Sequence, residues 1–392
     1  MKIMTAMYTV RRGGAYDRFL MMLEALLERG CEVHCLSLTP IQIRSPLFNN
    51  HLIRLPFLFN QPGLTKLSVL LLFPFYTLLI AWREKINIFI AFSFLYAFLQ
   101  AMSKWILKKP MVTLIRGDLG HALKMRGSLN NFLWLNRIVE YFGLMTSDRI
   151  LTVNSAIRSD ILAAVGNRRG IDVEILPNNI VVSDSFNPDD RTKVRDRYRI
   201  PSEARVLVTA GVLNRGKNIE LLLKVLPRIG ATSPFLFVVG DGSVKEDISY
   251  LEHLKGMAKE LGLREKVIFT GWLPKEECWR IFRASDLFLL PSLKEGMPNA
   301  LLEALGLDLP CLGSKIAGIQ DILYHEKLMF EPRDEGEVAI KVRHFFSEDK
   351  LCKDIIQLCR ERKKLFFFDW KERAFQMVTQ RPFHRGEAWP SK

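Results

Sequence analysis

Short apolar stretches alternate with amphipathic stretches along almost the whole chain, and this alternation limits the possible folds more than any other feature. Residues 2–10 (KIMTAMYTV) are typical of a buried strand, and residues 31–39 (CEVHCLSLT) of a second one. Between them, a glycine turn leads into a stretch whose apolar residues Phe19, Leu23 and Leu26 recur at helical spacing. A strand, a helix and a second strand in this order predict an α/β fold with a parallel sheet.

The alternation runs through the chain twice, on either side of a hydrophilic stretch at residues 185–204. A chain of 392 residues is also too long for one ordinary domain. We therefore expect two doubly wound α/β domains, residues 1–180 and 181–370, that face each other across a cleft. Residues 371–392 are expected to form a C-terminal helix and tail that return to the first domain.

The formal net charge of +14 is unevenly distributed. Residues 1–178 contain 21 Lys/Arg and 11 Asp/Glu, a net charge of +10. This excess predicts an anionic partner, which could be a nucleotide, a nucleic acid or a membrane surface. Six scattered cysteines lack C-x-x-C or zinc spacing, so we expect reduced thiols and no metal site. Asp189 and Asp190 are interpreted as solvated, and the absence of a signal-peptide core in MKIMTAMYTVRRGG predicts a cytoplasmic protein.

Two uncharged runs, residues 67–82 and 86–103, are candidates for membrane contact. The first is too short for a spanning helix, and the second is typical of a strand followed by a helix. We expect the first run to form a core helix or a helix on an anionic membrane surface. The basic residues around these runs are Arg11, Arg12, Lys66, Arg83, Lys85, Lys104, Lys108, Lys109, Lys124 and Arg126. The apolar residues expected to contact lipid are Phe57, Leu58, Phe59, Leu64, Leu67, Leu71, Leu72, Phe73 and Phe75.

The segment EGMPNALLEA, residues 295–304, is the strongest candidate for a functional site. Pro298 suits the first turn of a helix, and a helix start favours phosphate through its N–H groups and dipole. Gly296 lets the backbone approach a ligand closely. Glu295 before the turn and Glu303 within the helix are then placed to bind hydroxyl groups on either side of that phosphate. Arg215 and Lys217, in the loop after an earlier strand, would supply cations for a diphosphate.

This segment resembles the E-x7-E motif of family 4 retaining glycosyltransferases, which have the GT-B fold of two Rossmann-like domains. The resemblance extends through AGVLNRGKNIELLLKVLP, FVVGDG, VIFTGWLP and ASDLFLLPSLKEGMPNALLEALG, in the family order. It implies a bacterial-type enzyme of glycan, lipopolysaccharide or capsule biosynthesis. One departure is Val212, where the family usually has an arginine; Arg215 is the candidate to replace that charge.

The resemblance also implies a role for each matching residue. Glu295 would bind the donor sugar, Lys217 the diphosphate and Glu303 the ribose, and Asp118 would lie near the reacting carbon. Glu295, Lys217 and Asp118 are therefore the candidate catalytic residues, and Asp118 and His121 the candidate acceptor contacts. The candidate nucleotide-sugar contacts are Gly14, Arg215, Lys217, Gly240, Trp272, Leu273, Glu295, Gly296, Met297, Asn299, Ala300 and Glu303.

The function implied is transfer of a hexose from a nucleotide-diphosphate sugar, most simply a UDP-sugar, to a glycan or lipid-linked acceptor. No metal and no cofactor are implied, because the helix start and the basic side chains supply the electrostatic stabilisation. The enzyme is expected at the inner face of the cell membrane. A GT-B nucleotide-sugar epimerase is the alternative enzyme. A basic nucleic-acid-binding protein is the non-enzymatic alternative, although the chain has no recognisable nucleic-acid-binding motif.

Overall fold

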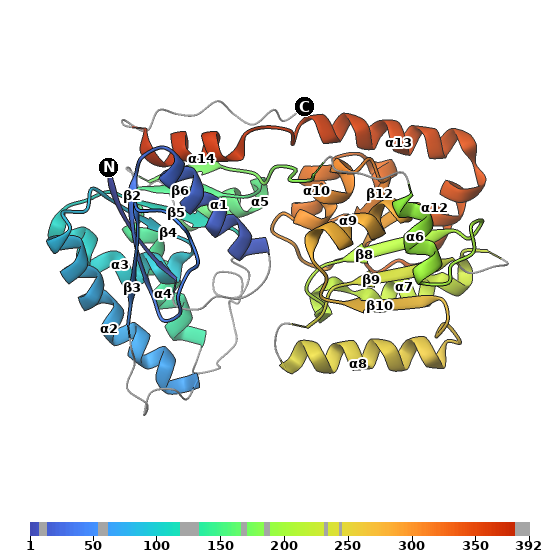
Figure 1. Cartoon of the computed structure of the whole chain (residues 1–392), viewed down its shortest axis with the longest axis horizontal. Coiled ribbons are helices and arrows are strands. Elements are labelled where there is room, and N and C mark those ends of the chain that lie inside the picture. Colours follow the sequence, from blue (N-terminus) through green and yellow to red (C-terminus); the bar gives the residue numbers. More distant parts are fainter. Residues whose placement is uncertain are drawn as a thin grey trace. The chain divides into compact units, whose positions relative to one another are not determined.

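The computed structural model describes residues 1–7, 14–53, 62–117, 133–165, 171–183, 189–230, 234–242 and 245–380. These residues form two compact units. Unit 1 comprises Met1–Pro177 and the segment from Asp369 onward, and unit 2 comprises Asn178–Phe368. Each unit has a parallel sheet with helices packed on it (Figure 1), which confirms the prediction of two doubly wound α/β domains.

The sheet of unit 1 has seven parallel strands in the order β3-β2-β1-β4-β5-β6-β7. The strands are β1 (Lys2–Met7), β2 (Glu32–Ser37), β3 (Phe48–Leu52), β4 (Ile88–Ala91), β5 (Met111–Ile115), β6 (Arg149–Thr152) and β7 (Asp172–Ile175). The helices are α1 (Gly14–Glu28), α2 (Pro62–Arg83), α3 (Phe94–Leu107), α4 (Leu133–Thr146), α5 (Ser155–Val165) and α14 (Trp370–Thr379). Because parallel crossovers are right-handed, α1 covers one face of this sheet and α2, α3 and α4 cover the other.

β3 is a strand that the apolar pattern does not predict. Its sequence, FNNHL, is mostly polar and lies at the edge of the sheet. Asn50 Nδ2 donates to Ser37 Oγ at 2.8 Å, and His51 Nε2 lies 3.0 Å from His34 Nδ1. Side-chain hydrogen bonds to β2 therefore take the place of an apolar face in this strand.

α2 is apolar on its buried side and also on its exposed side. Phe73 is fully buried in the core that α2 and α3 form with the sheet, whereas Leu71 and Phe75 are exposed and Leu72 is half-buried. The prediction that Phe73 contacts lipid is therefore wrong, because its position on the helix faces the core. Phe57, Leu58, Phe59, Arg11, Arg12, Lys124 and Arg126, and the side chains of Leu64, Lys66 and Leu67, lie outside the part of the chain that the structure describes.

α14, which follows unit 2 in the sequence, packs on α1 of unit 1. Trp370, at the start of α14, is 1% exposed, and the guanidinium carbon of Arg18 lies 5.5 Å from its ring centroid. Arg29 Nη2 lies 2.8 Å from a carboxylate oxygen of Glu372. Lys371 Nζ lies 3.0 Å from Glu24. These contacts make α14 part of unit 1.

The sheet of unit 2 has six parallel strands in the order β10-β9-β8-β11-β12-β13. The strands are β8 (Val206–Ala210), β9 (Phe235–Val239), β10 (Val267–Gly271), β11 (Leu287–Leu290), β12 (Cys311–Ser314) and β13 (Met329–Phe330). The α-helices are α6 (Asp190–Arg197), α7 (Ile219–Val225), α8 (Lys245–Glu260), α9 (Lys275–Ala284), α10 (Asn299–Gly306), α11 (Ala317–Leu323), α12 (Glu335–Ser347) and α13 (Asp349–Lys364). Most residues of β8, β9, β11 and β12 are fully buried.

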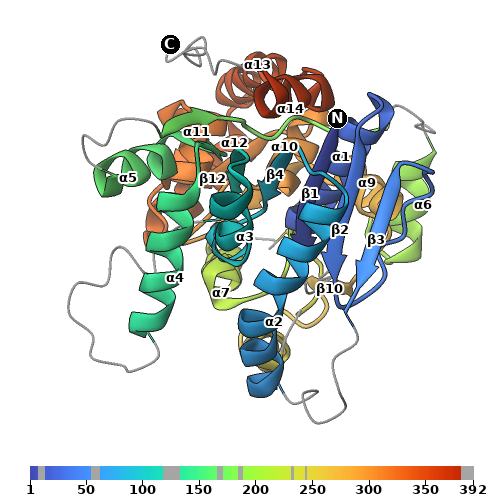
Figure 2. The same cartoon turned by 90° about the vertical axis from the view of Figure 1, so that its left-hand side faces the viewer.

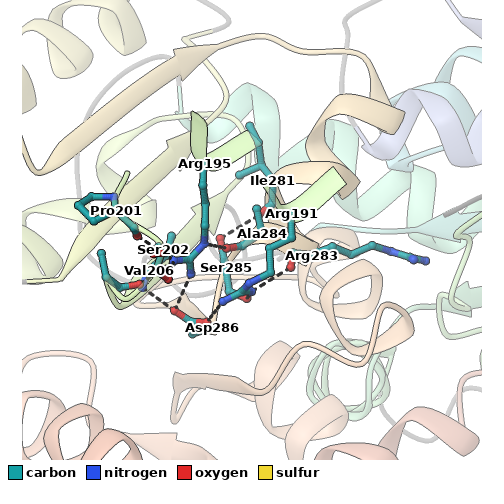
Figure 3. A network of polar contacts seen from close by, with 11 residues as sticks. Arg191, Arg195, Pro201, Ser202, Val206, Ile281, Arg283, Ala284, Ser285 and Asp286 are labelled. Atoms are coloured by element: carbon teal, nitrogen blue, oxygen red, sulfur yellow. Dashed lines mark hydrogen bonds and ion pairs between the residues drawn. The ribbon is translucent and has the colours of Figure 1, made fainter. Parts of the chain in front are cut away.

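α6 occupies the hydrophilic stretch expected to contain the linker, and an ionic network fixes it to unit 2 (Figure 3). Asp286 lies 2.5 Å from Arg191 Nη2 and 3.3 Å from Arg195 Nη2, and it accepts the Val206 N–H at 2.8 Å. Arg195 also donates to the carbonyl of Ser202 at 2.7 Å. Asp190 is an ion-pair partner of Arg280 at 3.7 Å with 13% of its side chain exposed. Its interpretation as a solvated residue is therefore wrong, because the stretch folds onto the domain.

Candidate functional site

The strand order of unit 2 reverses between β8 and β11. β9 and β10 lie on one side of β8, and β11, β12 and β13 lie on the other side. In doubly wound sheets, ligands bind beyond the carboxyl ends of the strands at this point of reversal. The loops after β8 and β11 therefore define the candidate site, and they contain Lys217 and Glu295.

Lys217 and Glu295 form an ion pair that joins these two loops. Lys217 Nζ lies 2.6 Å from Glu295 Oε1, and the two side chains are only 16% and 12% exposed. Ser292 Oγ donates to the same carboxylate oxygen at 2.7 Å. The fold thus places a cation and a carboxylate side by side from segments far apart in the sequence. Ser292 was not predicted, and only its closeness in sequence to Glu295 could have suggested it.

Further hydrogen bonds hold the two loops together. The Leu293 N–H donates to the carbonyl of Gly216 at 2.8 Å, and Asn218 Nδ2 donates to the carbonyl of Pro291 at 3.1 Å. Asn214 accepts the Gly216 N–H at 2.9 Å, which closes the turn that carries Lys217. Lys217 and Glu295 therefore belong to a hydrogen-bonded framework.

Three glycines with positive φ end the strands next to this framework. Gly211 (148°), Gly240 (123°) and Gly271 (67°) lie at the carboxyl ends of β8, β9 and β10. A Cβ atom on Gly211 would lie 3.0 Å from Lys217 Cε, so this glycine makes room for the lysine. A Cβ atom on Gly240 would lie 2.0 Å from the carbonyl oxygen of Gly211. Gly240, predicted to contact the nucleotide, is thus required for the packing of two strand ends.

Gly318 supports the loop that carries Glu295, and sequence reasoning did not identify it. It lies in the first turn of α11, where a Cβ atom would be 2.2 Å from the Gly296 carbonyl oxygen and 2.5 Å from that of Glu295. The backbone of Glu295 and Gly296 therefore lies directly on α11. No local pattern marks such a contact between separate segments.

α10 starts at Asn299, directly after Pro298, and this helix start is the one predicted to bind phosphate. The side chains at this start already have partners, because Asn178 donates from its backbone N to Met297 Sδ at 3.0 Å and from Nδ2 to Asn299 Oδ1 at 2.7 Å. Met297 is 8% exposed, and Ala300 is half-buried in the first turn. Met297 and Ala300 can therefore offer a ligand chiefly their backbone groups.

Glu303 lies close to α9 and to the loop after β10. Trp279 Nε1 donates to Glu303 Oε2 at 3.3 Å. Burial, together with Glu303, raises the pKa of the Cys278 thiol to about 11. Cys278 in turn donates to the carbonyl of Leu273 at 3.7 Å. The fold thus connects Glu303 with the predicted nucleobase loop, in which Leu273 is half-buried and Trp272 is 39% exposed.

Arg215 lies against a different neighbour from Lys217. Its guanidinium carbon is 5.8 Å from the ring centroid of Tyr250, and the side chain is exposed. Tyr250 is buried and donates to the carboxylate of Glu220; burial and this neighbour raise its pKa. Lys217, and not Arg215, is therefore the cation that contacts Glu295 in this structure.

The predicted site residues of the first domain lie in unit 1 or outside the described residues. Gly14 begins α1. Asp118 and His121 lie outside the part of the chain that the structure describes.

Among the described residues, one group of side chains has the spacing of metal ligands, namely Glu32, His34 and Glu84 in unit 1. Lys2 Nζ lies 3.2 Å from Glu32 and 3.9 Å from Glu84. Arg83 Nε also lies 2.8 Å from Glu84, so two cations balance the two carboxylates, and we interpret the group as an ion-pair cluster. The described residues around Lys217 and Glu295 form no group of this kind.

The part of the chain that holds this site is similar to a known protein family. Residues 190–362 match the family model described as "Glycosyl transferases group 1". This part of the chain is therefore similar to glycosyltransferases of group 1. The match includes Lys217, Gly240, Glu295 and Glu303 and begins after the end of unit 1's first segment.

Individual relatives of the chain are also named as glycosyltransferases. The chain is 30% identical over 182 residues to TuaC of Bacillus subtilis, which is named as a proposed teichuronic acid biosynthesis glycosyltransferase; the match covers 46% of this chain and 43% of TuaC. The matches to the first four curated relatives span only 42% to 56% of their lengths.

Solved structures resemble the chain over nearly its whole length. Sucrose-phosphate synthase from Thermosynechococcus elongatus has a TM-score of 0.77 at 18% identity, covering 96% of this chain and 97% of that one. Anabaena HepE in complex with UDP-glucose has a TM-score of 0.74 at 16% identity, covering 96% and 99%. These similarities concern the fold, and they confirm the predicted GT-B fold class of two Rossmann-like units.

Proposed function

We propose that the protein is a retaining glycosyltransferase that moves a hexose from a nucleotide-diphosphate sugar to an acceptor hydroxyl. The observation that carries this proposal is the ion pair between Lys217 and Glu295 beside the start of α10. In a nucleotide sugar, the sugar is bonded directly to the diphosphate. A group that binds phosphate and a group that binds sugar hydroxyls must therefore be neighbours. Lys217 and Glu295 meet this condition, because Lys217 Nζ lies 2.6 Å from the Glu295 carboxylate.

The other site residues extend this arrangement to the rest of the donor. With a donor bound, Lys217 would turn from Glu295 to the diphosphate, and Glu295 would turn to the sugar hydroxyls. Glu303 would accept hydrogen bonds from the ribose, and the loop with Trp272 and Leu273 would border the nucleobase. The acceptor would be a glycan or lipid-linked molecule held by unit 1.

The chemistry proposed is a front-face displacement. The bond between the anomeric carbon and the phosphate oxygen breaks, and its electron pair stays on the phosphate. The acceptor oxygen forms the new bond on the same face, and its proton passes to the leaving phosphate oxygen. The Lys217 ammonium and the helix start would stabilise the growing phosphate charge, so neither a metal nor a cofactor is assigned.

Two similarities support the finer parts of the proposal. HepE, whose fold the chain shares, is a protein whose structure was solved with UDP-glucose, which favours a UDP-sugar donor. The name of TuaC, teichuronic acid biosynthesis glycosyltransferase, favours a role in a cell-surface polymer such as lipopolysaccharide or capsule. We place the enzyme in the cytoplasm at the inner face of the cell membrane.

A thermal-shift screen with UDP, GDP and ADP in the presence of EDTA tests the donor site. A nucleotide at 100 times its dissociation constant adds about 2.7 kcal/mol of stability. With all nucleotides at one concentration, UDP is expected to give the largest shift. The sugar product of the UDP-sugar that stabilises best is then examined by NMR. Activity that EDTA abolishes and Mg²⁺ restores would overturn the metal-free site, and a product with inverted anomeric configuration would overturn the retaining mechanism.

The same assay separates the alternatives. A nucleotide-sugar epimerase would convert the donor without an acceptor, so incubation of the donor alone distinguishes it from a transferase. A nucleic-acid-binding protein would lose its activity on nuclease treatment. We expect transfer that requires an acceptor and is insensitive to nuclease.

A further inference from the structure

The side of unit 1 that carries α2 and the end of α3 exposes an unusual number of large apolar side chains. On α2, Leu71, Phe75, Leu79 and Trp82 recur at intervals of four, four and three residues, and Tyr76 lies beside them. Their exposed fractions range from 43% to 69%. At helical rise, this stripe is about 16 Å long.

The end of α3 adds to this stripe. Trp105 and Ile106, in its last turn, are 54% and 58% exposed. α2 and α3 pack against each other, and they lead into the adjacent strands β4 and β5. The Phe89 N–H donates to the carbonyl of Pro110 at 2.9 Å, so the ends of both helices lie at the same edge of the sheet. We call the seven residues Leu71, Phe75, Tyr76, Leu79, Trp82, Trp105 and Ile106 the apolar face. Figure 2 shows the backbone of α2 and α3, the two helices that carry these residues.

The core does not require these side chains. Val69, Phe73 and Ile80, on the other side of α2, are between 0% and 6% exposed and already pack in the core. An apolar surface of this kind on a folded domain marks an interaction site. The question is then which partner covers it.

Cations surround the helix ends at the apolar face. Arg83 and Lys85 follow Trp82, and Lys108 follows Ile106 and Leu107; all three cations are exposed. The sequences of α2 and α3 contain no Asp or Glu. Glu84 is the nearest acid in the sequence, and its pairing with Arg83 at 2.8 Å offsets that charge, so Lys85 and Lys108 carry the positive charge at these helix ends. Lys104 was predicted to contribute a positive charge to this surface. It does not, because its side chain is 14% exposed and its Nζ lies 2.8 Å from the carboxylate of Asp148.

We infer that the apolar face docks on an anionic lipid bilayer. Tryptophan and tyrosine favour the headgroup level of a bilayer, and flanking lysine and arginine favour anionic lipid. A second copy of this chain fits less well, because a two-fold contact through this face would bring the same cations together. No helix among the described residues is long and apolar enough to cross a membrane, so the contact lies on the bilayer surface.

Flotation of the full chain with vesicles tests this inference. We expect binding to vesicles of phosphatidylcholine with about one third phosphatidylglycerol, weaker binding at high salt, and little binding to pure phosphatidylcholine. The double variant Phe75→Ser/Trp82→Ser should lower the partition coefficient at least about tenfold, since each substitution removes apolar area from the bilayer. Both side chains are exposed, at 65% and 69%, so the fold should survive.

The matched control is Ile248→Ser/Phe367→Ser in unit 2, whose side chains are 54% and 56% exposed. It should bind vesicles as the wild type does. Lys85→Gln/Lys108→Gln should weaken binding to anionic vesicles only, whereas Lys259→Gln/Lys350→Gln, which carries the same charge change on unit 2, should weaken it much less.

Three results would overturn the inference: no binding of the wild type, equal binding to neutral and anionic vesicles, or undiminished binding of the Phe75→Ser/Trp82→Ser variant. A wild-type dimer in light scattering that this variant dissociates would instead identify a second copy as the partner. The inference stands apart from the proposed catalytic function, because the UDP-induced thermal shift should be the same in all these variants.

Discussion

At the scale of single residues, Lys217 carries the clearest expectation. Lys217→Ala removes the cation next to the proposed leaving group, so turnover should fall on the order of 10²-fold or more. Initial rates of UDP release from the donor and acceptor measure this. The control is Lys259→Ala, which removes an exposed lysine of α8 and should leave the rate unchanged. A Lys217→Ala enzyme with the wild-type rate would remove the lysine from the mechanism.

Glu295 and Glu303 should respond differently to the same substitution. Glu295→Ala removes a contact to the reacting sugar, so it should lower kcat sharply, because positioning at the reacting centre is lost. Glu303→Ala should mainly raise KM for the donor and weaken UDP binding, because the ribose is remote from the reaction. Steady-state kinetics and UDP titration distinguish the two. If both variants changed only KM, the assigned role of Glu295 would be wrong.

Glu140, on α4, predicts a pH dependence of stability. Burial raises the pKa of its carboxyl to about 7, and its Oε2 has no hydrogen-bond partner among the described residues. A carboxyl with a raised pKa in the folded state holds its proton more tightly there than in the unfolded chain. Its contribution to stability is therefore present below the ordinary glutamate pKa and is lost as the pH rises to about 7.

Glu140→Gln removes this dependence. The unfolding free energy of the variant minus that of the wild type should therefore increase as the pH rises from 5 to 8. Urea titration at each pH measures both values. The comparison with the wild type cancels other titrating groups, such as His51, whose pKa burial lowers. A difference between the two proteins that stays constant over this range would contradict the assignment.

At the scale of elements, the attachment of α6 to unit 2 depends on Asp286. Asp286→Ala leaves the buried Arg195 without its carboxylate partner and the Val206 N–H without its acceptor, so it should destabilise unit 2 by about 3 kcal/mol. Chemical denaturation followed by fluorescence measures the loss. Glu277→Ala is the control. It removes the half-buried partner of Arg197, an exposed residue of α6, and should cost less than about 1 kcal/mol. A loss of less than about 1 kcal/mol for Asp286→Ala would show that the network is dispensable.

At the scale of the whole molecule, unit 1 depends on a helix that follows unit 2 in the sequence. Trp370→Ala empties a fully buried position of α14 and should destabilise unit 1 by about 3–5 kcal/mol, although Trp370 lies near the end of the chain. Limited proteolysis should then cleave unit 1 first, while UDP still stabilises unit 2. Phe367→Ala, three residues earlier and 56% exposed, should change little. Early cleavage in unit 2 would contradict this division of the chain.

Much of the fold could be predicted from the sequence because it rests on local patterns. Buried parallel strands are continuous apolar runs, and helices show a 3.6-residue period, so most elements of both units were predicted. The polar edge strand β3 and the charged helix α6 were not, because hydrogen bonds and ion pairs to distant segments stabilise them. The local apolar pattern does not indicate such contacts, so it predicts neither β3 nor α6.

For the site, the sequence by itself identified the candidate residues: Lys217, Glu295 and Glu303, at motif positions beside glycine and proline. Only the tertiary structure decided which of them meet. It paired Lys217 rather than Arg215 with Glu295, added Ser292, and placed Gly318 against the backbone of Glu295. It also separated Phe73 in the core from Phe75 on the surface. The physical reason is that contacts and burial depend on segments brought together by the sheet topology, and the spacing of residues along one segment does not contain that information.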